Sequence, residues 1–291
     1  SSIAKKWWMA LTGLFLCLFL VGHLLGNLQL LADGPEGKLA FNQYAYFMTH
    51  NIFIKVLSYV TYISILFHAI DGIMLTIQNK KARPVKYAYN KPGANSSTPS
   101  RYMAILGSAI LIFIVIHMSN FWGKMHFTEM PLHKTHVEDP GTGVETAFYA
   151  TQTPGQYVPV EAFDKGMNGE PTYETKNGTE FYLKQAGLKM GEGYKDLHSV
   201  TLAFFGHDKT KEASLEANKF ALWAVVAYVL SMFVLAFHLW HGFASAFQTL
   251  GIRHKKYTPV MSGIGKAFSI LVPLGFAIIP ILIFMAAQAA K

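Results

Sequence analysis

The stretch RYMAILGSAILIFIVIHMSNFWG, residues 101–123, decides the fold. After Arg101 it contains no Asp, Glu, Lys or Arg, and most of its side chains are large and apolar. An α-helix rises about 1.5 Å per residue, so about 20 such residues cross a hydrocarbon core of about 30 Å. The stretch therefore predicts a membrane-spanning helix with one histidine, His117, inside it.

Four further apolar blocks predict four more spanning helices. The five predicted helices cover residues 7–32, 52–78, 101–123, 218–250 and 266–288. Of the 17 acidic residues, 14 lie between Glu129 and Glu216, which leaves the apolar blocks almost free of acid. Lys5 and Lys6 precede the first block as in a signal peptide, but its apolar run is longer than an h-region, so we expect a retained helix.

The predicted class is all-α, a five-transmembrane-helix bundle that forms one transmembrane domain over residues 1–291. A long extracytoplasmic insertion, residues 124–217, separates the third and fourth helices. It is rich in Gly, Pro, Thr, Glu and Tyr, which indicates loops with short strands, for example at 156–160 and 180–183. Residues 196–205 are expected to form a short amphipathic helix on the membrane surface.

The charges of the loops predict the orientation. Positive charge without any acid occurs before the first helix, in the loop after the second helix and in the loop after the fourth helix. These three segments fall on one side of the membrane if all five helices span it. Because loops rich in Lys and Arg stay in the cytoplasm, we expect a cytoplasmic N-terminus and an outer C-terminus in a bacterial inner membrane.

Composition excludes several functions for this chain alone. Cys17 is the only cysteine, so the chain cannot hold a thiolate-bound iron–sulfur cluster or a CxxCH haem attachment. No glycine-rich nucleotide motif follows a predicted strand, and nothing indicates binding to nucleic acid. Flavin or iron–sulfur chemistry would have to lie on another chain.

Four histidines lie at matching depths in four predicted helices. His23, His68 and His117 each lie 16 residues after the start of their blocks, and His238 lies 20 residues after Asn218. Helices one and three run outward and helices two and four run inward. His23 and His117 are therefore expected near the outer face, and His68 and His238 near the inner face.

Two imidazoles at one depth can hold a haem iron from both sides. A single membrane histidine is more often a hydrogen-bonding or cavity residue, but four histidines paired by depth favour two bis-histidine haems over a proton path. His241 shares a helix face with His238 and is the alternative ligand. His126, His133 and His136 could form a zinc cluster, but no cysteine joins them and a solvated role is favoured.

Several stretches resemble the di-haem cytochrome b anchor of succinate dehydrogenase and fumarate reductase, of the type with a single five-helix subunit. They are VGHLLGNLQ (21–29), FNQYAYFM (41–48), FHAIDGIMLTIQNKKARPVKY (67–87), SRYMAILGSAILIFIVIHMSNFW (100–122) and FHLWHGFASAFQTLGIRHKKYTP (237–259). The last stretch is the most specific, and the resemblance extends over all five helices.

The resemblance implies two haems b, with His23 and His117 as ligands of the outer haem and His68 and His238 as ligands of the inner haem. It implies a flavoprotein subunit and an iron–sulfur subunit on the cytoplasmic side. Electrons would pass between these subunits and a membrane quinone, commonly menaquinone. The whole complex could form a homo-oligomer, and membrane lipid would surround the helices.

Further candidate residues follow from their expected positions. Quinone candidates at the outer face are Asn42, Tyr44, His50, Asn120, Trp122 and Lys124, and candidates to bind haem propionates at the inner face are Ser100, Arg101 and Arg253. Asp71, the only carboxylate inside a predicted span, follows His68 by three residues and is a candidate proton relay.

Three other functions remain open from the sequence. The chain could be the cytochrome b anchor of a different dehydrogenase, such as a hydrogenase or a formate dehydrogenase. It could be a haem-free proton or ion transporter that uses the four histidines and Asp71. It could also be a purely structural anchor.

Overall fold

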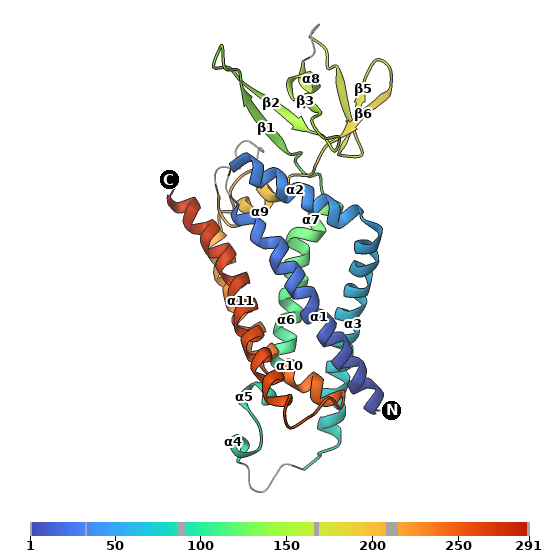
Figure 1. Cartoon of the computed structure of the whole chain (residues 1–291), viewed down its shortest axis with the longest axis vertical. Helices are drawn as coiled ribbons and strands as arrows, with labels where there is room; N and C mark the ends of the chain where they lie inside the picture. The colour runs from blue at the N-terminus through green and yellow to red at the C-terminus, as the bar shows by residue number, and fades with distance from the viewer. Residues whose placement is uncertain (1, 33, 86–90, 166–168, 208–214, 290–291) are drawn as a thin grey trace. The chain divides into compact units, whose positions relative to one another are not determined.

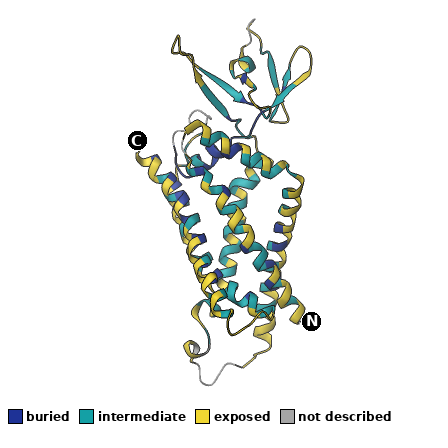
Figure 2. Cartoon of the chain, in the orientation of Figure 1, coloured by how far each residue is buried: buried dark blue, intermediate teal, exposed yellow. Residues whose placement is uncertain are grey.

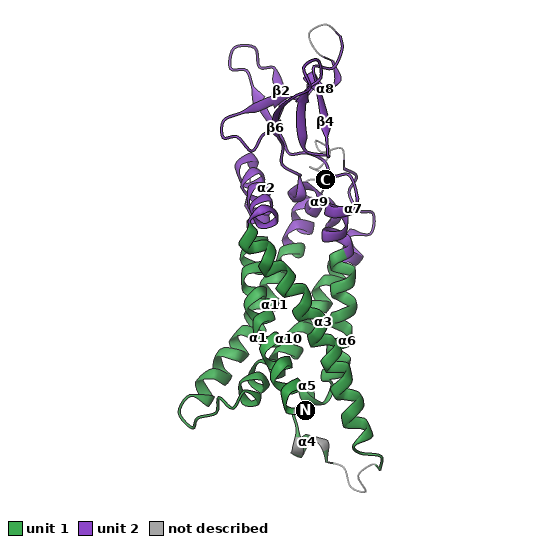
Figure 3. Cartoon of the chain, turned by 90° about the vertical axis from the view of Figure 1, so that its right-hand side faces the viewer, with its two compact units in different colours: residues 1–27, 52–118, 225–281 green, residues 28–51, 119–224, 282–291 purple. Residues whose placement is uncertain are grey.

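The computed structural model describes residues 2–32, 34–85, 91–165, 169–207 and 215–289. The chain is mostly helical, with 67% of its residues in helices. It divides into two compact units (Figure 3). Unit 1 comprises residues 1–27, 52–118 and 225–281, and unit 2 comprises residues 28–51, 119–224 and 282–291. That residues 1–291 form one transmembrane domain stays a prediction.

Five long helices carry the membrane-spanning segments. They are α1 (Ser2–Leu28), α3 (Ile52–Lys81), α6 (Met103–Met118), α10 (Ala221–Thr249) and α11 (Thr258–Ala289) (Figure 1). The apolar helical segments Ile3–Leu31, Ile52–Lys81, Met103–Phe127, Ala221–Thr249 and Thr258–Ala289 are each long enough to cross a membrane. The prediction of five helices that are long and apolar enough to span a membrane is confirmed.

Many residues along these helices are exposed (Figure 2), and large apolar residues are among them. Leu18 is 70% exposed and Phe53 is 80% exposed. A soluble protein rarely leaves so much contiguous apolar surface in water. The exposed faces therefore suit contact with lipid, as expected of a multi-pass membrane protein.

Several helix boundaries differ from the predicted ones, and the starts of the third and fifth long helices are two examples. The third long helix begins at Met103, because α5 (Thr98–Arg101) is a separate short helix that ends before Tyr102. The fifth begins at Thr258, eight residues before the predicted start at Lys266. The charge of Lys266 is accommodated inside α11 because its Nζ lies 5.7 Å from the centroid of the Trp240 ring.

Unit 2 contains a helix that the sequence did not predict, α2 (Gly34–His50). Its start has local causes: Gly34 adopts φ +80°, Pro35 stands in the first turn, and Glu36 adds a negative charge near the helix N-terminus. Shorter helical elements are η1 (Gln29–Leu31), the π-helix η2 (Ser119–Gly123), α7 (Lys124–Phe127), α8 (Glu161–Asp164) and α9 (Leu197–Phe204). The short helix predicted at 196–205 is present as α9, and its position on the membrane surface stays a prediction. One more short helix, α4 (Pro92–Asn95), lies in unit 1.

Two antiparallel sheets of three strands lie between α7 and α9 in the chain. The first has the order β1 (Lys134–Glu138), β2 (Glu145–Ala150), β3 (Tyr157–Pro159), and the second β4 (Tyr173–Lys176), β5 (Glu180–Leu183), β6 (Leu188–Glu192). Lys134 pairs with Tyr149 in the first sheet, and Thr175 pairs with Phe181 in the second. The Phe181 side chain is fully buried, with its ring centroid 5.0 Å from that of Phe163. The predicted strands at 156–160 and 180–183 correspond to β3 and β5.

Candidate functional site

The His23 and His117 rings face each other in unit 1, from α1 and α6. Their centroids lie 5.8 Å apart, and their planes are nearly perpendicular at 86°. The Tyr228 hydroxyl of α10 lies 3.4 Å from Nδ1 of His117. The Asn27 amide donates to the His23 backbone carbonyl at 2.8 Å and lies 3.4 Å from Nδ1, which orients the ring without fixing its tautomer.

Aromatic side chains surround this first pair. Phe19 stacks on His23 with a centroid distance of 5.3 Å, and Phe113 stacks on His117 at 5.7 Å. The Phe276 ring of α11 lies 5.6 Å from His23. This apolar shell limits access of water to the two imidazoles.

The His68 and His238 rings form a second pair in unit 1, from α3 and α10. Their centroids lie 6.2 Å apart with an angle of 69° between the planes. The Thr12 hydroxyl lies 2.9 Å from the Trp8 carbonyl, 3.1 Å from the Met9 carbonyl and 3.3 Å from Nδ1 of His68. In the tautomer that carries the proton on Nδ1, His68 donates to this hydroxyl and its Nε2 lone pair is free to bind a metal.

His238 contributes a buried ring nitrogen. Within the described parts of the chain, its Nδ1 atom has no hydrogen-bond partner. Such atoms are uncommon in folded proteins, because an unsatisfied buried polar group costs about 1–3 kcal/mol. The neighbouring candidate His241 is half-buried and forms no ring pair with His68. The geometry thus brings His238, and not His241, to His68.

Both pairs fit the coordination of one metal ion by two imidazoles. With metal–nitrogen bonds of about 2.0 Å on opposite sides of the ion, the two ring centroids would be about 6 Å apart. The two centroid separations in the structure are 5.8 Å and 6.2 Å. Two neutral imidazoles from different helices are an axial ligand set for haem iron, so the residues present fit that group.

Two glycines let the second pair lie close to the helix backbones. A Cβ atom on Gly13 of α1 would lie 3.1 Å from Cε1 of His68, and one on Gly107 of α6 would lie 3.6 Å from Cε1 of His238. Gly13 precedes His23 by ten residues, and Gly107 precedes His117 by ten residues. The two histidine pairs are therefore separated by about 15 Å along both helices.

Sequence reasoning missed Gly13, Gly107, Thr12 and Tyr228. Gly13, Gly107 and Tyr228 each lie ten residues before a histidine of the same helix, and this repeated spacing is visible in the sequence. Without knowledge of which helices are neighbours, however, that offset has no meaning. Asp71 is buried in α3, three residues after His68, as its sequence position suggested.

The quinone candidates all belong to unit 2 and occupy different settings. Tyr44 is half-buried in α2, and the exposed His50 stacks on Tyr46 with a centroid distance of 3.8 Å. Asn120 and Trp122 lie in the π-helix η2, and Trp122 stacks on His126 at 4.4 Å. Asn42 is buried, whereas Lys124 is exposed.

Asn42 lies in a buried polar cluster of unit 2, formed by Lys38, Asn42, His133, Asp196 and His198. The Asn42 amide nitrogen lies 3.0 Å from Nδ1 of His133 and 3.0 Å from Oδ1 of Asp196, and its oxygen accepts from the His198 backbone N–H at 3.0 Å. Nζ of Lys38 lies 3.0 Å from Oδ2 of Asp196. The polar cluster joins α2 to the start of α9.

Burial keeps both histidines of this polar cluster neutral at pH 7. Burial lowers the pKa of His133 to about 4 and that of His198 to about 4. Burial alone would raise the pKa of Asp196, but Lys38 and the donated hydrogen bonds hold it below its usual value. Asp196 is therefore the charged partner of Lys38.

The remaining candidates are placed as follows. The Arg101 guanidinium donates to the Ser96 carbonyl at 2.5 Å and to the Thr98 hydroxyl at 3.1 Å, so it is bound within its own short segment. Ser100 lies in α5 beside it, and Arg253 is exposed after α10. Among the described residues, no group of three or more His, Cys, Asp or Glu is placed to bind a metal, so His126, His133 and His136 form no zinc cluster.

Comparison with known proteins identifies no relative: no family model, no curated protein and no solved structure matches this chain significantly. Its function has to be inferred from the chemistry and geometry of its own residues.

Proposed function

We propose that this chain is the di-haem b membrane anchor of a succinate:quinone oxidoreductase, of the succinate dehydrogenase and fumarate reductase family. One observation carries the proposal. Two histidine pairs from four membrane helices lie at two levels, with ring centroids 5.8 Å and 6.2 Å apart. The resemblance of the ligand-bearing stretches to this family supports the assignment to a particular enzyme.

His23 and His117 would hold one haem and His68 and His238 the other. Haem supplies a one-electron Fe(II)/Fe(III) couple when it is bound. The chain's own residues present the ring nitrogens and exclude water with Phe19, Phe113 and Phe276. Thr12 would accept a hydrogen bond from Nδ1–H of His68 and leave Nε2 for the iron.

Succinate and fumarate chemistry would take place on a flavoprotein subunit, which an iron–sulfur subunit connects to this anchor. The basic loop after α3 and Arg253 with its neighbours after α10 would face the cytoplasm and those partners. Residues 124–217 would then lie outside a bacterial inner membrane. The quinone, of the menaquinone type in the resembling family, would bind near the outer pair.

The test is a reduced-minus-oxidised spectrum combined with haem counting on the purified chain and its variants. Wild type should contain two b haems. His23→Ala and His117→Ala should remove the same spectral component, and His68→Ala and His238→Ala the other. His241→Ala is the matched control on α10 and should keep both. A colourless wild-type protein, or loss of haem only with His241→Ala, would reject the proposal.

The buried Asp71 favours a second candidate function, a proton or ion path through the bundle. An intramembrane carboxylate commonly marks a transport pathway. This function predicts a protein without haem in which Asp71→Asn abolishes proton flux into vesicles. An anchor of another dehydrogenase would contain haem but would purify without a flavin-bearing succinate dehydrogenase subunit.

A further inference from the structure

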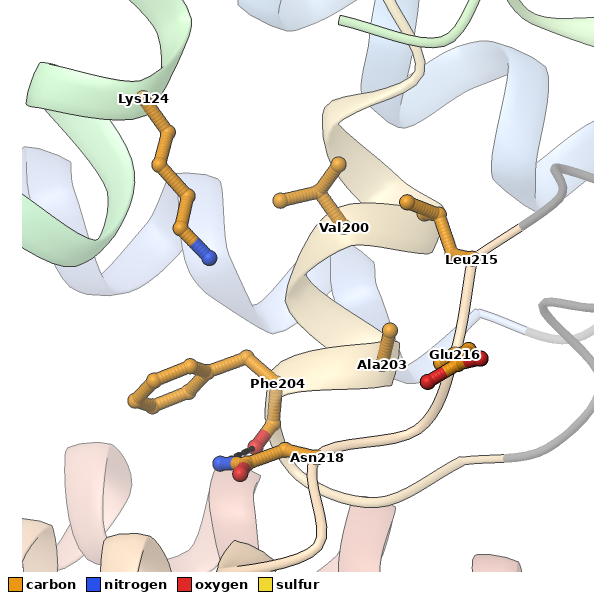
Figure 4. A pocket seen from close by; sticks show the side chains of 7 residues that line it. All are labelled: Lys124, Val200, Ala203, Phe204, Leu215, Glu216 and Asn218. Atoms are coloured by element: carbon orange, nitrogen blue, oxygen red, sulfur yellow. Dashed lines mark hydrogen bonds between the residues drawn. The ribbon is translucent and has the colours of Figure 1, made fainter. Parts of the chain in front are cut away.

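A pocket of unit 2 with a volume of about 310 Å³ is lined by α7, α9 and the residues before α10 (Figure 4). Val200 and Phe204 of α9 and Leu215 supply apolar surface, and Lys124, Glu216 and Asn218 supply polar groups. In Figure 4 Lys124 and Glu216 lie on opposite sides of the pocket. The pocket is therefore amphipathic, with a charge of each sign at its edges.

The polar groups of this pocket differ in availability. The Asn218 amide is engaged, since its nitrogen donates to the Phe204 carbonyl at 3.0 Å and its oxygen accepts from the Phe220 N–H at 3.0 Å. In the part of the chain that the structure describes, Lys124 and Glu216 form no ion pair with each other or with a third residue. The two opposite charges are thus available to a ligand.

The position of Lys124 indicates the depth of the pocket. Lys124 falls in the last turn of Met103–Phe127, a segment long enough to span the membrane. Basic side chains at the end of such a segment extend to the level of the lipid headgroups. A pocket with this residue on its wall therefore opens where headgroups are concentrated.

We propose that this pocket binds the headgroup of a zwitterionic phospholipid with a primary ammonium group, phosphatidylethanolamine. Lys124 would bind the phosphate, Glu216 would accept hydrogen bonds from the ammonium group, and Phe204 and Val200 would contact the first carbons of the lipid. An anionic lipid fits less well, because Glu216 repels it. A quinone is uncharged and leaves both charges without a partner.

The test measures lipid binding by native mass spectrometry of the full chain, purified with any subunits that it retains. Dioleoyl phosphatidylethanolamine should bind more tightly than the phosphatidylcholine analogue, whose trimethylammonium group has no N–H donor. Lys124→Gln should weaken binding of phosphatidylethanolamine roughly fivefold. Glu216→Gln should abolish the preference over phosphatidylcholine. Lys219→Gln, next to the pocket but not lining it, is the matched control and should leave binding unchanged.

Two further measurements guard against misfolded variants. Each variant should unfold at the wild-type temperature, and mono- and dimethylated phosphatidylethanolamines should bind the unmodified protein progressively more weakly. Equal binding of the methylated series, or tighter binding of phosphatidylglycerol to wild type, would overturn the proposal. So would displacement of the lipid by a short-chain quinone in wild type but not in Lys124→Gln, which would assign the pocket to quinone.

Discussion

At the scale of single residues, the second histidine pair depends on the absence of a side chain at Gly13. A Cβ atom added at Gly13 would lie 3.1 Å from Cε1 of His68, which is tighter than ordinary van der Waals contact. The Thr12 hydroxyl beside it binds Nδ1 of the same ring. Neighbouring positions of α1 thus set both the close approach and a hydrogen-bond partner of one proposed ligand.

Gly13→Val should therefore displace the His68 ring and remove one haem of the proposed two, because the added methyl groups would occupy the position of the imidazole. The haem content of the purified protein, measured as the pyridine haemochrome, checks this. Gly22→Val is the control on the same helix, since a Cβ at Gly22 meets nothing within 4 Å. A Gly13→Val protein with the wild-type haem content would show that Gly13 does not position His68.

At the scale of elements, close packing of α11 against α10 also requires a glycine. A Cβ on Gly265 would lie 2.5 Å from Cδ1 of Phe243, whereas one on Gly263, half a turn earlier, would meet nothing within 4 Å. Alanine is favoured over glycine in a helix by about 1 kcal/mol. The two positions therefore separate helix propensity from packing.

Gly263→Ala should raise the unfolding temperature slightly, and Gly265→Ala should lower it. The first gains up to about 1 kcal/mol from propensity, while the second must move the Phe243 ring. Thermal unfolding of both variants in the same detergent gives the comparison. A rise of similar size in both would mean that the Phe243 ring moves without cost.

We expect the packing of α2 on α9 to depend on pH through the buried polar cluster. The pKa of His133 and of His198 is lowered by burial from 6.5 to about 4. Between these pH values the locally opened state binds more protons than the closed state, so stability falls as pH drops from 6.5 towards 4. Lys38 opposes a positive charge on both histidines, and Asp196 favours it. His198 also opposes a charge on His133, and His207 opposes one on His198.

Hydrogen exchange of the α2 and α9 amides should therefore accelerate at pH 4.5 relative to pH 7, after correction for the intrinsic exchange rate. Amides of the sheet β4–β6 provide the internal reference. The double variant His133→Gln, His198→Gln should lose most of this dependence. Protection of α2 that stays constant down to pH 4.5 would contradict the role assigned to these two histidines.

At the scale of the whole molecule, some features follow from the sequence and others require the fold. The five long helices could be predicted because membrane helices are regular. The similar depth of four histidines also predicted the pairing of His23 with His117 and of His68 with His238. The polar cluster could not be predicted from the sequence, because its hydrogen bonds join residues that are 91 and 154 positions apart. Likewise, α2 was not predicted, because its sequence has mixed polarity. Its start at Gly34 is set by local backbone and capping effects.

The orientation inferred from loop charge is the last prediction, and single cysteines can test it. Replacing the buried Cys17 of α1 by Ser gives a protein without cysteine, into which single cysteines can be introduced. Val144→Cys, between β1 and β2, and Ile252→Cys, after α10, are both well exposed, at 57% and 60%. If Lys and Arg keep their loops in the cytoplasm, a membrane-impermeant maleimide should label Val144→Cys in intact spheroplasts. Ile252→Cys should react only after the membrane is permeabilised, and the reverse pattern would mean that the basic loops face outward.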